Sequence, residues 1–132
     1  MVREALGVLS ITEGILTILL VGDRKIRKLN KEFFHKDSPT DVLSFSYGEK
    51  RNFDSPLEAT EEIEGDIIVS LDTVLDGEDE GYLSDEERVF FYVIHGVLHI
   101  IGHEHAVDKK KSREMRKLET EVFKKVTGKE VA

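Results

Sequence analysis

The chain has 132 residues, of which 39% are hydrophobic and 35% charged, with a net charge of −8 and no cysteine. This size and composition indicate a soluble globular protein with a single domain spanning residues 1–132 and one modest core. The missing cysteines exclude disulfides and thiolate metal ligands, and no apolar run reaches the length of a membrane span. A cytoplasmic location fits these features, and the negative charge argues against a general nucleic-acid-binding surface.

The first part of the chain predicts alternating helices and strands. Apolar residues at helical spacing predict a short helix over residues 2–9, and an apolar run bounded by glycines predicts a buried strand over residues 15–21. Asp23 can cap the next helix, which must end before Ser38 because a proline follows. Partial alternation of apolar residues predicts a second strand over residues 41–47.

The middle of the chain is acidic and irregular, then strongly apolar. Residues 48–64 predict a long loop. Residues 65–70 are apolar at successive positions and predict a third strand inside the sheet. Residues 72–75 predict a short helical turn, and residues 76–81 a polar connection.

The last part of the chain predicts two long helices. Ser84 followed by Glu87 forms a capping box that opens a helix with a broad apolar surface, so we expect this helix to be central and buried. A closing helix is predicted from about residue 108 to 126. The fold class expected is α+β: a small mixed sheet of three to four strands surrounded by helices, with a long central helix that carries the metal site.

Four of the five histidines lie within residues 95–105. His95 and His99 are four residues apart, so on a helix they lie on one face. Gly102 lets the chain turn and bring His105 toward them. Three imidazoles with an open fourth position are typical of a catalytic zinc site, where a bound water becomes acidic. The sequence therefore predicts one Zn²⁺ per chain, held by these three histidines.

The histidine spacing is also similar to that of metzincin peptidases, with one difference. Those peptidases carry a glutamate directly after the first histidine as general base. Gly96 occupies that position here and cannot accept a proton. The usual peptidase mechanism is therefore disfavoured.

Charge is segregated along the chain. Residues 54–87 contain fourteen acidic and no basic residues, whereas residues 22–36 and residues 108–132 each carry a net charge of +4. If the two basic segments share a face near the metal, that face can hold a polyanion. If they do not, they are solvated helix faces, and the sequence leaves both readings open.

The run from His95 to His105 resembles the signature of the YbeY family of bacterial endoribonucleases. Further family-like blocks appear in family order and cover the chain from about residue 15 onward. These blocks are Leu29-Asn30, the run from Pro39 to Phe45, the run from Gly65 to Ser70, and Met115 with Glu119.

The resemblance implies a zinc-dependent, single-strand-specific endoribonuclease. It would act in ribosomal RNA maturation, notably at the 3′ end of 16S rRNA, and in ribosome quality control in the cytoplasm. Its implied partners are ribosomal RNA and the small ribosomal subunit, without DNA or membrane. His95, His99 and His105 match the family's metal ligands directly.

The sequence departs from the family pattern in two places within these blocks. The family commonly has arginine between its asparagine and its Pro-Thr block, where an ungapped alignment puts Phe34. Another cation could replace it, the candidates for substrate binding being Arg24, Lys31 and Lys36. The usual Tyr-Asp pair before the last ligand is His103-Glu104 here.

Four further residues are candidates for the site. Glu104 could act as general base or, as we favour, orient an imidazole. Asp41 is a second candidate for the base, although at a strand end it could serve only as a cap. Thr40 and Ser44 could bind RNA phosphate, or simply satisfy backbone groups before the strand.

The sequence leaves three functions open. The first is metal-assisted hydrolysis of RNA phosphodiester bonds. The second is a metallopeptidase-like hydrolase. The third is a zinc-containing ribosome-assembly factor without catalysis, which the missing arginine at Phe34 favours.

Overall fold

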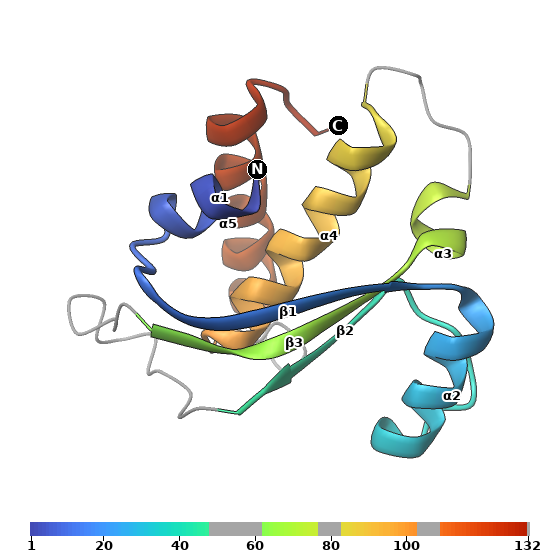
Figure 1. Cartoon of the computed structure of the whole chain (residues 1–132). Coiled ribbons are helices and arrows are strands. Elements are labelled where there is room, and N and C mark those ends of the chain that lie inside the picture. Colours follow the sequence, from blue (N-terminus) through green and yellow to red (C-terminus); the bar gives the residue numbers. More distant parts are fainter. Residues whose placement is uncertain (48–61, 77–82, 103–108, 132) are drawn as a thin grey trace.

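The computed structural model describes residues 1–47, 62–76, 83–102 and 109–131. These residues form five helices and three strands (Figure 1). In chain order they are α1 (Val2–Val8), β1 (Glu13–Val21), α2 (Asp23–Phe34), β2 (Val42–Ser46), β3 (Glu62–Ser70), α3 (Leu71–Leu75), α4 (Asp85–Ile100) and α5 (Lys109–Thr127). No helix in these ranges is long and apolar enough to cross a membrane.

The sheet is mixed and has the strand order β1-β3-β2, which confirms the expected class. β1 runs parallel to β3, and β2 runs antiparallel to it. The central strand β3 is buried on both faces, since Ile67, Ile68 and Val69 are all buried. The predicted interior position of this strand is therefore confirmed.

The sequence prediction is wrong at the starts of two strands and in the burial of β1, an edge strand whose residues are all exposed or partly exposed. Residues 62–64 were expected to end the acidic loop, but they form the first part of β3. They pair in parallel with residues 13–15 of β1, which also begins two residues earlier than predicted. Pairing with a neighbouring strand here outweighs the low strand propensity of glutamate. Residues 48–61, the rest of that predicted loop, lie outside the described residues.

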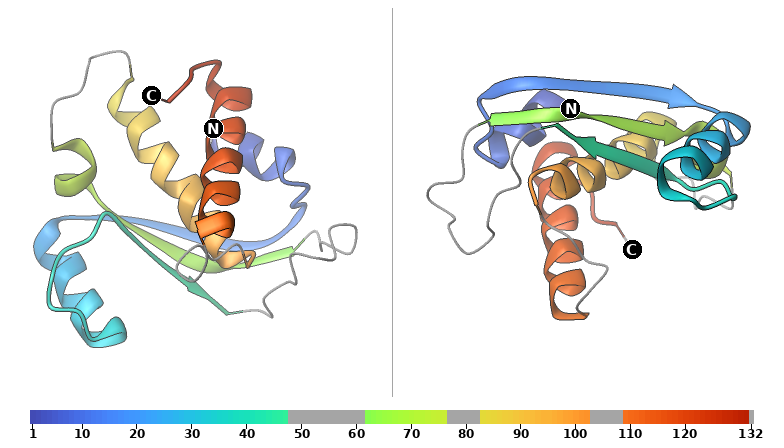
Figure 2. Two further views of the ribbon diagram at one scale, coloured as in Figure 1. Left: turned by 180° about the vertical axis from the view of Figure 1, so that it is seen from behind. Right: turned by 90° about the horizontal axis from the view of Figure 1, so that it is seen from below.

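The helices lie on the two faces of the sheet in unequal numbers (Figures 1 and 2). On one face, α4 packs against β3 and is flanked by α5 and α1. Ile67 of β3 there shares a core with Val93 and Val97 of α4. On the other face, α2 is the one helix among the described residues, and it buries Ile26 against Leu43 and Ile68.

The helix α4 is central, as the sequence predicts. Its capping box is formed: the Ser84 hydroxyl accepts from the backbone N–H of Glu87 at 3.1 Å, and the Glu87 carboxylate accepts from the backbone N–H of Ser84 at 2.8 Å. Lys129 donates to the same carboxylate and holds the pKa of Glu87 below its usual value. This cap fixes the start of the helix, and its last turns carry the histidines.

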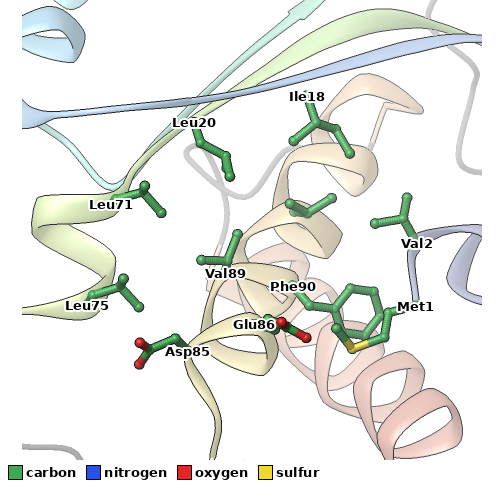
Figure 3. A pocket seen from close by; sticks show the side chains of 11 residues that line it. Met1, Val2, Ile18, Leu20, Leu71, Leu75, Asp85, Glu86, Val89 and Phe90 are labelled. Carbon is green, nitrogen blue, oxygen red and sulfur yellow. The ribbon is translucent and has the colours of Figure 1, made fainter.

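An apolar pocket of about 350 Å³ opens beside the first half of α4 (Figure 3). Side chains from β1, α3, α4 and the N-terminus line it, among them Ile18, Leu71 and Val89. Its acidic lining residues are Asp85 and Glu86. None of the predicted site residues lines this pocket, so it is separate from the histidine site.

Candidate metal centre

His95 and His99 lie on adjacent turns of α4 and face each other. Their Nε2 atoms are 3.0 Å apart and their ring centroids 4.6 Å apart. The predicted placement of the two imidazoles on one helix face is therefore confirmed. Two nitrogens at this distance either share a proton or point at a common ligand.

A buried carboxylate from α5 holds the first of these rings. Glu119 is 3% exposed, and its Oε1 atom contacts Nδ1 of His95. A carboxylate at Nδ1 favours the tautomer with the proton on Nδ1, so that Nε2 carries the lone pair that a metal needs. Glu119 therefore fixes the orientation of His95 and favours the lone pair on Nε2.

The geometry of the pair fits a zinc ion. Zinc–nitrogen bonds of about 2.0–2.1 Å in a tetrahedron place two ligand nitrogens roughly 3.3 Å apart. The observed Nε2–Nε2 separation of 3.0 Å is close to this value. Within the residues that the structure describes, no group of three or more potential ligands is close enough to hold a metal. His105, with His103 and Glu104, lies outside the described residues.

Gly96 explains how α4 comes so close to the sheet. The glycine is buried, and a Cβ atom added there would lie 2.9 Å from Cγ2 of Ile67 on β3. Gly65 of β3 makes a second close contact, because its Cβ would lie 2.4 Å from the Phe45 carbonyl oxygen and 2.9 Å from Ile100. Position 96 therefore faces the sheet, and a glutamate there would collide with the core instead of serving the histidines.

Tyr92 lies one turn before His95, and nearby charges shift the pKa of its hydroxyl. Burial raises the pKa of its hydroxyl, the Asp41 carboxylate raises it further, and the nearby guanidinium groups of Arg116 and Arg88 act in the opposite direction. The hydroxyl therefore stays protonated at neutral pH. Asp41 and the two arginines therefore contribute to the electrostatic field at this hydroxyl.

Asp41 and Thr40 are engaged with each other at the start of β2. Oδ1 of Asp41 accepts from the backbone N–H of Val42 at 2.7 Å and from the Thr40 hydroxyl at 3.3 Å. The Asp41 carbonyl accepts from the backbone N–H of Ser70 at 2.9 Å. Both side chains thus help to start the strand, and a role for Asp41 as base or for Thr40 at phosphate stays a prediction. Ser44 lies within β2 opposite Ile67.

The structure does not bring the cations of α2 to the histidines. Arg24 and Lys31 lie on α2 and Lys36 just beyond it, on the sheet face opposite α4 (Figure 2). Lys31 is 4.0 Å from Asp37, which also pairs with Arg27 at 2.8 Å. The two basic segments therefore do not share a face, because α5 lies with α4 and α2 lies across the sheet.

Sequence reasoning named Glu119 only as part of a family-like block and gave it no role beside His95, and it did not single out Arg116. Glu119 follows Met115 by four positions and precedes the buried Val122, so it lies on the inward stripe of α5. An acidic residue on an apolar stripe was the available signal. Arg116 gave no such signal, since its guanidinium carbon lies 5.3 Å above the Phe91 ring only after α4 and α5 have packed.

Known proteins resemble this chain over nearly its whole length. The family model of endoribonuclease YbeY matches residues 2–127. A protein of that name from Geobacter metallireducens is 36% identical, with 92% of this chain and 79% of the relative covered. One from Aquifex aeolicus is 34% identical, with 93% and 77% covered.

A third relative and a solved structure are also similar to this chain. The protein from Fusobacterium nucleatum is 42% identical, with 75% of this chain and 60% of the relative covered. The solution structure of TM1509 from Thermotoga maritima superposes with a TM-score of 0.62 at 28% identity, covering 96% of this chain and 77% of that one. This chain belongs to the endoribonuclease YbeY family.

Proposed function

We propose that this chain is a zinc-dependent endoribonuclease that cuts single-stranded segments of ribosomal RNA. Membership of the family gives the class of activity, hydrolysis of RNA phosphodiester bonds. Maturation of the 3′ end of 16S rRNA, ribosome quality control, association with the small subunit and a cytoplasmic location are the finer parts of the proposal. The resemblance of the motifs supports them.

One observation carries the proposal: the two Nε2 atoms converge while a buried carboxylate holds the far side of one ring. Two solvated surface histidines would not require a buried glutamate. A carboxylate–histidine pair is the usual support of a metal-bound imidazole. We infer that His95 and His99 hold one zinc ion, with His105 as third ligand.

The chain's own groups then have distinct tasks. Bound zinc supplies a Lewis acid for a phosphate oxygen and lowers the pKa of a coordinated water. Glu119 keeps the proton on Nδ1 of His95, and the packing of Gly96 on the sheet keeps the helix in place. For the general base, Asp41 and Glu104 remain the candidates, Asp41 because it directly precedes β2, which packs against α4.

Phosphoryl transfer also needs positive charge around the developing oxyanions. We infer that Arg116 supplies it, since this residue lies on α5 one turn before Glu119, and its guanidinium carbon is 5.3 Å from the ring centre of Phe91, one turn before His95. Arg88 lies in the first turn of α4, away from the histidines, where its guanidinium donates to the carbonyls of Leu75 and Asp76 at 3.3 Å. Arg116 therefore takes over, in the proposal, the role that the sequence left to the cations of α2.

The two alternatives are weaker. The peptidase reading lacks its base, and Gly96 shows why the position cannot hold one. The assembly-factor reading needs a closed zinc site, which usually has four protein ligands. Family membership favours the nuclease over both.

Cleavage of a structured ribosomal RNA fragment by the purified protein, beside the His99→Ala variant, tests the proposal. We expect the wild type to cut within single-stranded segments and the variant to leave the RNA intact. Equal cutting by both proteins would point to a contaminating nuclease. Zinc and RNA binding by the wild type without any cutting would favour the assembly factor, and His99-dependent digestion of an unfolded protein the peptidase.

A further inference from the structure

Three phenylalanine rings gather on the face of the sheet that α2 covers. Phe33 and Phe34 end α2, and Phe45 lies on the edge strand β2 between them. The Phe45 ring centroid is 5.4 Å from that of Phe33, edge to face, and 5.5 Å from that of Phe34, tilted by 38°. Phe45 belongs to the core under α2, so it anchors the other two rings.

Phe33 and Phe34 remain open to solvent. They are 55% and 43% exposed, and each is large enough to have been buried if packing were its only role. Exposed neighbouring aromatic rings on a soluble protein mark a binding surface more often than scattered single apolar residues do. The two rings are therefore suited to bind a molecule with flat apolar faces.

The charges around the two rings indicate which kind of molecule binds there. Residues 22–36 carry six basic and two acidic residues on a chain whose net charge is −8. The basic side chains of α2 are exposed to solvent. On the sheet beside them, Glu64 is exposed and Asp66 accepts from the Tyr47 hydroxyl at 2.6 Å. An anionic backbone is thus favoured along α2 and repelled from the strand β3.

We propose that Phe33 and Phe34 form a stacking platform for bases of single-stranded RNA, whose phosphates run along the cations of α2. Aromatic rings beside a basic groove are the usual way in which proteins hold unpaired strands, because every base has a face that can stack. This inference rests on the proposed function, because it concerns nucleotides of the same substrate that flank the cut.

The position of β2 relates the platform to the histidines. β2 is an edge strand, with the aromatic cluster on one face and α4 packed against the other. A strand of RNA that passes around this edge reaches both faces without crossing the sheet. The platform should prefer unpaired RNA, because bases within a duplex are not free to stack on a protein ring.

Binding of two fluorescently labelled oligoribonucleotides tests the platform, with EDTA present so that neither is cut. One oligonucleotide carries bases, and the other is its abasic counterpart with the same phosphates. For the Phe33→Ala, Phe34→Ala double variant we expect affinity for the first to fall about tenfold or more, since stacking on one ring contributes about 1–3 kcal/mol per base. Affinity for the abasic strand should stay unchanged, which also shows that the variant is folded.

Two further variants separate stacking from charge and from general loss of apolar surface. Lys28→Gln should weaken both oligonucleotides and lower the salt dependence of binding by about one phosphate contact. Ile15→Ala, at the opposite edge of the sheet and 69% exposed, should leave both affinities unchanged. Since the chain has no tryptophan, Phe34→Trp provides a single reporter whose fluorescence the stacked base should quench.

Two results would overturn the inference. One is equal binding of both oligonucleotides by the wild type and the double variant, while the wild type still cuts RNA. The other is a change in oligomeric state of the double variant with unchanged RNA affinity, which would make the rings a contact between protein chains. If the wild type neither cuts nor binds RNA, the proposed function fails instead.

Discussion

Replacing any one of His95, His99 and His105 with alanine is expected to lower zinc content far below one ion per chain. Each change removes one of three ligands, and the remaining pair binds zinc weakly. Loss of an outer partner alone typically costs 10–100-fold in metal affinity, so loss of a ligand should cost more than about 100-fold. Metal content after gel filtration, measured by mass spectrometry, checks this.

A fourth histidine provides the matched control. His35 closes α2 in a left-handed conformation, at φ 58° and ψ 30°, on the opposite side of the sheet from α4. Asparagine tolerates this conformation, so His35→Asn removes an imidazole without straining the backbone. It should keep one zinc per chain. Full zinc occupancy in any of the three alanine variants would refute the assignment of that histidine as a ligand.

Changes at Glu119 should weaken the zinc site without removing a ligand. Glu119→Gln keeps an oxygen that can accept from Nδ1 of His95 but loses the negative charge, and we expect zinc to bind about tenfold more weakly. Glu119→Leu removes the acceptor, so Nδ1 loses its protein partner. We expect this variant to bind zinc about 100-fold more weakly and to lose about 1–3 kcal/mol of unfolding free energy.

Two measurements separate the metal-related role of Glu119 from a purely structural one. Competition with a zinc chelator gives the affinity, and urea unfolding of the metal-free protein gives the stability. Glu121→Gln, at an exposed position of the same helix, is the matched control and should change neither. If Glu119→Gln and Glu119→Leu bind zinc as the wild type does, Glu119 is only a packing residue.

The parts of the fold that sequence predicts well are those decided locally. The capping box at Ser84 and the two histidines four residues apart depend on one helix alone, and both are found as expected. The apolar run of β3 also identifies the central strand without knowledge of its neighbours. Such features need no tertiary contact to be recognised.

The parts that sequence predicts poorly depend on which elements meet. Residues 62–64 look like loop because they are acidic, yet parallel pairing with β1 makes them strand. The cations of α2 are candidates for the site from the sequence, yet that helix packs on the other sheet face. Glu119 lies twenty-four residues from His95 along the chain, and only the packing of α5 on α4 joins them.

Phe34 shows how the structure changes the meaning of a departure from the family pattern. In the sequence it stands where the resemblance implies an arginine, which suggests lost catalytic charge. In the structure it belongs to an aromatic cluster with Phe45, while Arg116 of α5 lies over the Phe91 ring, one turn before His95. The proposed cation therefore comes from α5 instead of from α2.

The rate of RNA cleavage by metal-free protein, measured as zinc is added back, tests whether the hydrolysis depends on zinc. If zinc on the three histidines performs the hydrolysis, metal-free protein should be inactive. Activity should then rise in proportion to added zinc and level off at one ion per chain. Cleavage by metal-free protein at the rate of the zinc-loaded protein, with chelator present throughout, would show that zinc does not perform the hydrolysis.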